Sequence, residues 1–169
     1  DPWPVFVAQK DSQHAALLYS GGNSPRARYH VMGLKPAGWF ISQRGQVEIR
    51  SADQTQKIKV VDPIKAAFDW FEQQRAKSEI LPVFFPGGCI GYFSYDVCRH
   101  VEQLPEFAKY HPVPEVYLIQ FDELWIYDRQ TDELIFAWQP QSGLSFQKAS
   151  EQYQRMIDQW PKLRDSYQY

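Results

Sequence analysis

Few cysteines, no long apolar run and no excess of charge of one sign limit what this 169-residue chain can be. The two cysteines, Cys89 and Cys98, show no CxxC spacing, which excludes a disulfide framework and argues against a structural zinc site. No apolar run approaches the roughly 20 residues that a membrane helix needs, so we expect no membrane partner. The net charge of −2 lacks the basic footprint of a nucleic-acid-binding protein.

The common catalytic motifs are missing as well. The chain contains no GxSxG, P-loop or HExxH motif and no strand–GxGxxG–helix unit. Its four histidines show no spacing typical of a metal site. We therefore expect no catalytic residue, no metal ligand and no cofactor in this chain. The two cysteines suit a reduced, cytoplasmic location. The length suits one domain spanning residues 1–169, and a start at Asp rather than Met suggests a piece of a longer protein.

Aromatic residues are abundant instead, at 16% of the chain, which suits β-sheet cores or a large contact surface. Short β-type runs separated by glycine and proline turns lie at residues 15–20, 27–32, 38–42, 46–50 and 56–61. Gln43-Arg44-Gly45 predicts a tight hairpin. Residues 115–128 and 133–138 predict a long hairpin that turns at 129–132, and Asp122-Glu123 interrupts its first strand as a bulge or a solvated edge.

Helical patterns occur three times. Asp62 and Pro63 suit the cap and first position of a long helix with an apolar stripe of Ile64, Ala67, Phe68 and Phe71. A short helix is expected at 97–104, capped by Asp96. A second long helix is expected between a Ser145 cap and a stop at Pro161. The chain is therefore predicted to be α+β, with mainly antiparallel sheets packed with two longer amphipathic helices and one short helix.

Two local segments carry the functional hypotheses. In PGGCIGYFSYD (residues 86–96), Gly91 within a strand implies close approach of another backbone or a large ring. This segment is interpreted as a turn–strand–helix packing element, or alternatively as a phosphate or carboxylate cradle. The second segment is LLYS (residues 17–20) followed by Arg28-Tyr29, which together could line a small-molecule pocket in which Arg28 binds a carboxylate. Its alternative is core packing with a buried hydrogen bond.

These segments resemble a known family. FFPGGCIGYFSYDVCRHVEQLPE is similar to the signature GG–x–x–G–[YF]–x–x–YD–x–x–R–x–x–E–x–LP of component I chorismate-utilising enzymes. LLYS and RYHVMGLKP are similar to that family's early pair, LLxS followed by RY/F and G/A–x–P. The resemblance spans nearly the whole chain but only the amino-terminal region of such enzymes.

The resemblance implies a scaffolding and regulatory domain without turnover of its own. A chorismate-binding domain outside these residues would hold Mg²⁺, and a glutamine amidotransferase subunit would supply ammonia. By carry-over, an aromatic amino-acid pocket, with L-tryptophan as its ligand, would involve Leu18, Ser20, Arg28 and Tyr29. The glycine-rich segment, with Gly87, Gly88, Gly91, Tyr95 and Asp96, is assigned a structural role.

The residue at position 19 indicates which member of the family the chain resembles more. Anthranilate synthases usually carry LLES, whose acidic residue and serine belong to the tryptophan feedback pocket, whereas this chain has Tyr19 before Ser20. A phenol cannot pair with an ammonium group as a carboxylate does. The resemblance therefore favours aminodeoxychorismate synthase of p-aminobenzoate and folate synthesis, with anthranilate synthase as the alternative. A stand-alone interaction or ligand-binding module is the alternative from another class.

Overall fold

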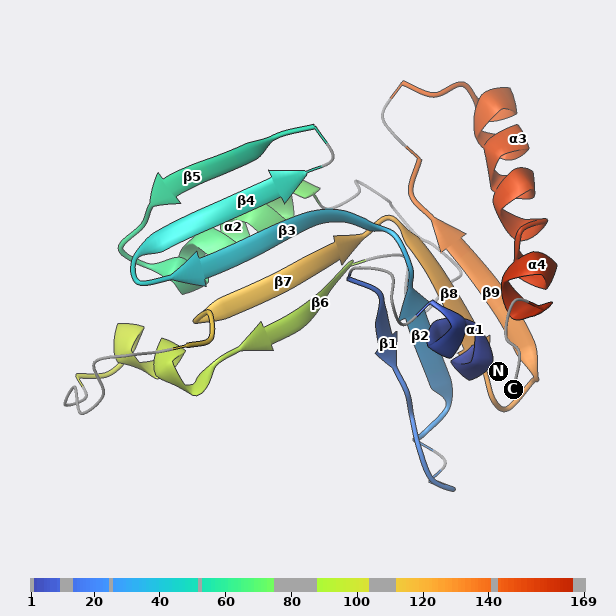
Figure 1. Ribbon diagram of the computed structural model, residues 1–169, viewed down its shortest axis with the longest axis horizontal. Helices are drawn as coiled ribbons and strands as arrows, with labels where there is room; N and C mark the ends of the chain where they lie inside the picture. Colours follow the sequence, from blue (N-terminus) through green and yellow to red (C-terminus); the bar gives the residue numbers. More distant parts are fainter. Residues whose placement is uncertain are drawn as a thin grey trace. The chain divides into compact units, whose positions relative to one another are not determined.

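The computed structural model describes residues 2–9, 14–24, 26–51, 53–74, 88–103, 112–140 and 143–165. The chain divides into two compact units, each formed from separate stretches of sequence. The first unit comprises residues 1–36, 79–87 and 121–169, and the second comprises residues 37–78 and 88–120. Two sheets with antiparallel pairing and flanking helices confirm the predicted α+β fold (Figure 1).

The first unit has a four-stranded sheet in the order β1-β2-β8-β9. The strands are β1 (Ala16–Leu18), β2 (Tyr29–Gly33), β8 (Glu123–Asp128) and β9 (Glu133–Trp138). Its helices are α1 (Trp3–Ala8), α3 (Phe146–Ile157) and α4 (Trp160–Asp165). The core of this unit is formed by Val5, Met32, Trp125 and Phe136, against which residues of α1, α3 and α4 pack.

The second unit has a five-stranded sheet in the order β5-β4-β3-β7-β6. The strands are β3 (Pro36–Gln43), β4 (Gln46–Ser51), β5 (Thr55–Lys59), β6 (Gly88–Phe93) and β7 (Val116–Phe121). The helix α2 (Pro63–Gln74) and the 3₁₀ helix η1 (Tyr95–His100) complete the unit. Its core contains Phe40, Val47, Ala67, Trp70 and Val116.

Local signals in the sequence placed several elements correctly. Gln43 pairs with Gln46 across the Arg44-Gly45 turn, where both residues have the positive φ that a tight hairpin turn requires. The backbone N–H of Lys65 donates to Asp62 Oδ1 at 2.9 Å, so Asp62 caps α2 as expected. The predicted turn at 129–132 connects β8 and β9, which are paired antiparallel.

The predicted strand over residues 115–128 is wrong as a single element. It is interrupted before Glu123, as expected, and its two halves belong to different sheets: β7 to the second unit and β8 to the first. The carbonyl of Asp122 accepts a hydrogen bond from the N–H of Gln139 at 2.8 Å, which fixes the interruption beside the end of β9. The long hairpin is therefore formed by β8 and β9 alone.

The helices also differ in detail from the prediction. Phe68 is 59% exposed, whereas Ala67 and Trp70 are buried, so the buried stripe of α2 is rotated by about one position. The reason is the indole of Trp70, which packs on the ring of Phe40 with centroids 5.6 Å apart. Pro161 does not stop the last long helix but lies in the first turn of α4, where no N–H donor is needed.

Two further helix predictions were incomplete or wrong, and one helix was not predicted. The short helix is a 3₁₀ helix that begins at Tyr95, before the expected start, and Ser94 rather than Asp96 occupies its cap position. Ser145 occupies the cap position of α3 without a side-chain hydrogen bond. No sequence pattern indicated α1, because its valine and aromatic residues favour strands. Within the described residues, no helix has the length and apolar character needed to span a membrane.

Candidate functional site

The four predicted pocket residues lie at the ends of two neighbouring strands in the first unit. Leu18 is the last residue of β1, pairs with Val31 and is 48% exposed. Ser20 follows two residues later, Arg28 directly precedes β2, and Tyr29 begins it. The structure thus brings these residues to one region, while their role in ligand binding stays a prediction.

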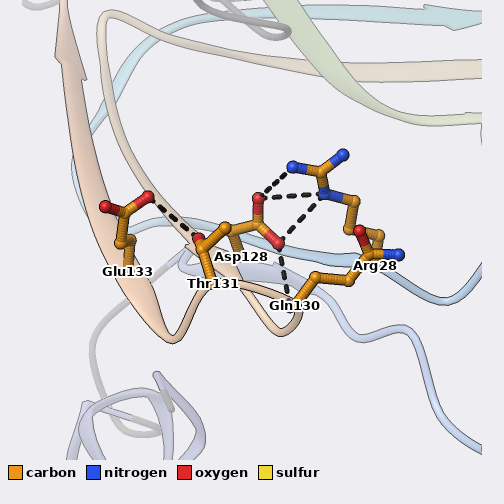
Figure 2. Close-up of polar contacts among 5 residues, drawn as sticks. All are labelled: Arg28, Asp128, Gln130, Thr131 and Glu133. Carbon is orange, nitrogen blue, oxygen red and sulfur yellow. Dashed lines mark hydrogen bonds and ion pairs between the residues drawn. The ribbon is translucent and has the colours of Figure 1, made fainter.

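Arg28 already holds a carboxylate, and that carboxylate belongs to Asp128 at the end of β8 (Figure 2). Its Nε donates to the two carboxylate oxygens at 3.0 and 2.9 Å, and its Nη2 donates to Oδ2 at 2.6 Å. The guanidinium carbon also lies 4.8 Å from the ring centroid of Tyr29, a cation–π distance. The predicted bidentate contact of Arg28 is therefore made within the chain.

Asp128 remains ionised because of these contacts. Its carboxylate is nearly fully buried, which by itself would favour the neutral acid. The hydrogen bonds from Arg28 outweigh burial and lower the pKa of Asp128 to about 2, and the N–H of Gln130, 2.9 Å from Oδ1, acts in the same direction. Asp128 in turn raises the pKa of Arg28. The two groups form a charge-compensated clamp between the start of β2 and the β8–β9 turn.

A stack of aromatic rings involves the next residues along the same two strands, where His30 pairs with Tyr127. The imidazole of His30 is 2% exposed and stacks on the ring of Tyr19, with centroids 4.0 Å apart and an interplanar angle of 5°. On its other side lies the ring of Tyr127, at 5.8 Å and 17°. Tyr19 also meets the indole of Trp3 edge to face at 5.5 Å. Burial is the main cause that lowers the pKa of His30, and the charge of Arg129 adds to it.

Arg129 holds the segment between β1 and β2. Its Nη1 donates to the backbone carbonyls of Ser20, Gly22 and Ala27 at 3.0, 3.0 and 2.8 Å. Sequence reasoning missed the contributions of Asp128, Arg129 and His30. Arg129 is the first residue of the predicted 129–132 turn and Asp128 directly precedes it, but nothing in the sequence says which strand that turn approaches.

This site has the chemistry of a binding surface. Trp3, Leu18 and Tyr19 each leave about half of their surface exposed, and the charge of Arg28 is compensated by Asp128. Half-exposed rings and an apolar side chain suit contact with an apolar or aromatic group. Among the residues that the structure describes, no three His, Cys, Asp or Glu side chains gather in a way that could hold a metal ion.

The glycine-rich segment in the second unit has the close backbone contact that the sequence predicted. A Cβ added to Gly91 would lie 1.9 Å from the carbonyl oxygen of Tyr117 and 2.9 Å from Cα of Leu118, so β6 passes directly against the backbone of β7. Asp96 accepts a hydrogen bond from Nε of Arg99 at 3.1 Å.

Two other residues of this segment, Tyr95 and Gly87, give no support to the structural assignment. Tyr95 is 88% exposed and contributes little to packing. Gly87 lies outside the described residues.

The sequence itself is similar to component 1 of two enzymes. The chain is 29% identical over 129 residues to aminodeoxychorismate synthase component 1 of Bacillus subtilis (strain 168), an alignment that covers 76% of this chain and 26% of that protein. It is 28% identical over 172 residues to anthranilate synthase component 1 of Acinetobacter calcoaceticus, covering 96% of this chain and 34% of that protein. These homologues support the resemblance to component I of the chorismate-utilising enzymes.

Two further comparisons complete this assignment. No protein-family model matches the chain. The structure is similar to that of anthranilate synthase component I from Streptococcus pneumoniae TIGR4, with a TM-score of 0.61 and 15% identity over 89% of this chain and 32% of that chain. At this identity the likeness shows the fold alone. The chain spans about a quarter to a third of the length of the relatives it matches.

Proposed function

We propose that this chain is the amino-terminal scaffolding and regulatory domain of an aminodeoxychorismate synthase component I. The complete enzyme would replace the 4-hydroxyl group of chorismate with an amino group and so form 4-amino-4-deoxychorismate for p-aminobenzoate and folate synthesis. The observation that carries this proposal is the similarity to the Bacillus subtilis aminodeoxychorismate synthase component 1 over three quarters of the chain.

The remaining parts of the reaction belong to groups outside these 169 residues. A chorismate-binding domain would hold Mg²⁺ against the chorismate carboxylate, and a glutamine amidotransferase subunit in the cytoplasm would supply ammonia. Nδ1 of His30 accepts from the backbone N–H of Ser20, and Nη1 of Arg129 donates to the Ser20 carbonyl, so both side chains hold the backbone of this residue. A supporting role for this chain is consistent with that arrangement.

The environment of Tyr19 favours the aminodeoxychorismate enzyme over the anthranilate enzyme. The phenol ring stacks on His30 and touches Trp3, so this position serves aromatic packing. A carboxylate at the same place would lose both ring contacts and would be needed only to pair with the ammonium group of a bound amino acid. The anthranilate synthase alternative is supported by the Acinetobacter relative, which aligns with 96% of the chain.

The test is to supply chorismate, glutamine and the amidotransferase subunit to this chain and, separately, to the full product of its gene. We expect no amination by the 169 residues and formation of 4-amino-4-deoxychorismate by the full product. Growth of a p-aminobenzoate auxotroph, but not of a tryptophan auxotroph, gives the same result in cells. Amination by the isolated chain would overturn the supporting role, and anthranilate as the product would select the alternative.

The pocket is tested separately by calorimetric titration of this chain with L-tryptophan, with Ser20→Ala as the control variant. Binding that is lost in Ser20→Ala would assign the pocket to Ser20 and favour the anthranilate synthase alternative. Absence of heat with both proteins would contradict a tryptophan pocket within this chain. A gene that ends shortly after Tyr169 would instead support a stand-alone binding module.

A further inference from the structure

The backbone of Ser20 is held by side chains rather than by the sheet. Ser20 lies two residues beyond the end of β1, where the strand ladder has stopped. Its N–H donates to Nδ1 of His30 at 3.1 Å, and its carbonyl accepts from Nη1 of Arg129 at 3.0 Å. Both backbone groups of this one residue are therefore oriented by side chains from β2 and from the β8–β9 turn.

The hydrogen bond to His30 depends on the protonation state of its imidazole. Nδ1 can accept a hydrogen bond only when it carries no proton, which requires the neutral ring with its proton on Nε2. The ring cannot easily turn to offer another atom, because Tyr19 and Tyr127 stack on its two sides. Protonation at Nδ1 would place two N–H donors face to face and break the contact with Ser20.

The charged groups around His30 oppose protonation. Burial lowers its pKa most, and the positive charge of Arg129 lowers it further. The phenols of Tyr19 and Tyr127 face the ring, and the hydroxyl of Tyr127 donates to Asp132 at 2.6 Å. Helix α1, which meets this stack through Trp3, carries no ionisable side chain. The neutral ring is therefore the form present at pH values above 6.5, the ordinary pKa of histidine.

We propose that His30 is a positioning residue that fixes the Ser20 backbone while its imidazole is neutral and releases it on protonation. This inference rests on the proposed function in one respect, namely that Ser20 contributes to a pocket for an aromatic amino acid. Acidification then weakens the binding of that ligand, because the backbone of Ser20 is released. The Arg28–Asp128 clamp does not change, since its carboxylate has a pKa of about 2.

The direct test follows the backbone amide of Ser20 by ¹⁵N NMR between pH 8 and pH 5, together with the imidazole nitrogens of His30. We expect the two signals to titrate together, with one midpoint below 6.5, the ordinary pKa of histidine. A Ser20 amide that stays unchanged while the imidazole titrates would overturn the positioning role. An imidazole that remains neutral throughout this range would overturn the release step.

Two variants separate the acceptor from the ring. His30→Asn places Oδ1 at the same number of bonds from Cα as Nδ1, so it keeps an acceptor that does not titrate. His30→Phe keeps a stacking ring and removes the acceptor. We expect hydrogen exchange of the Ser20 amide at pH 7 to be about tenfold faster in His30→Phe, and close to wild type in His30→Asn. Equal exchange in wild type and His30→Phe would contradict the proposal.

The ligand experiment then distinguishes this inference from the proposed function. L-Tryptophan should bind the wild-type chain more weakly at pH 5.5 than at pH 7.5, by less than about tenfold because the pKa of His30 lies below 6.5, and should bind His30→Asn equally at both pH values. An affinity of the wild-type chain that does not change with pH would contradict the release step. Absence of binding at pH 7.5 refutes only the pocket, because the amide titration and the exchange rates decide the role of His30 without any ligand.

Discussion

Replacement of Gly91 by alanine should detach the edge of the second unit's sheet. The added Cβ would lie 1.9 Å from the carbonyl oxygen of Tyr117, whereas ordinary contacts begin at 3.4 Å. The obstacle is backbone, so no side chain can turn aside, and β6 has to move away from β7 by about 1.5 Å, the difference between these two distances. A hydrogen bond of ordinary length does not survive such a displacement.

The cost of this displacement follows from its two parts. Forcing an extra carbon into a filled space costs about 1–3 kcal/mol, and each ladder hydrogen bond that is lost adds about 1 kcal/mol. We therefore expect Gly91→Ala to lower the free energy of unfolding by about 3–5 kcal/mol, a large part of the about 5–15 kcal/mol of a typical domain. With a urea dependence of about 2 kcal/mol per molar, the unfolding midpoint falls by roughly 1.5–2.5 M.

The assay is urea unfolding monitored by tryptophan fluorescence, with Gly21→Ala as the matched control. Gly21 has no atom within 4 Å of an added Cβ, so this variant makes the same chemical change without a collision. We expect its free energy of unfolding to lie within about 0.5 kcal/mol of that of wild type. A Gly91→Ala midpoint equal to that of Gly21→Ala would refute the close approach of β6 to β7.

Three further predictions concern the core and the site. Phe40→Ala, which empties a fully buried position, should cost about 3–5 kcal/mol in urea unfolding, whereas truncation of the exposed Val61 to alanine should cost almost nothing. The ionised Asp128 carboxylate stabilises the fold at pH values above its ordinary pKa of 3.8, and this contribution is lost as the pH falls towards about 2. Asp128→Asn should therefore be less stable than wild type at pH 6, and its stability, followed by circular dichroism, should depend less on pH between pH 4 and pH 2. Arg129→Gln should speed limited proteolysis between residues 20 and 28, because the Arg129 side chain donates hydrogen bonds to three carbonyls of that segment. Arg164→Gln is the control, since the guanidinium of Arg164 pairs with the adjacent Asp165, and its cleavage rate should match wild type. Equal cleavage rates for the two variants would contradict the anchoring role of Arg129.

Much of the local structure could be predicted because it depends on neighbours in the sequence. Asp62 and Pro63 begin α2 whatever lies around them, since one supplies an oxygen for a free N–H and the other needs no donor. Arg44 and Gly45 likewise form a hairpin turn from their own backbone preferences. Gly91 indicated a close contact, although the partner strand was not evident from the sequence.

The candidate site was only partly predictable. The sequence drew attention to Ser20 and Arg28 through a resemblance, but it could not show that Arg28 pairs with a carboxylate 100 residues away. His30 looked like any isolated histidine until the pairing of β2 with β8 placed it opposite Tyr127. Contacts between strands depend on register, and register is decided by the whole sheet rather than by either strand.

The α+β class, the Asp62 cap and the tight turns could be predicted from the sequence alone, because they arise from backbone geometry and side chains within a few residues. The division of residues 115–128 between two sheets depends on tertiary packing, since both halves have the same strand-forming composition. Tertiary packing also decided that α2 buries Trp70 rather than Phe68, because the largest ring fills the space over Phe40. The ring stack and the guanidinium that hold Ser20 come from segments far apart in the chain, and only folding brings them together.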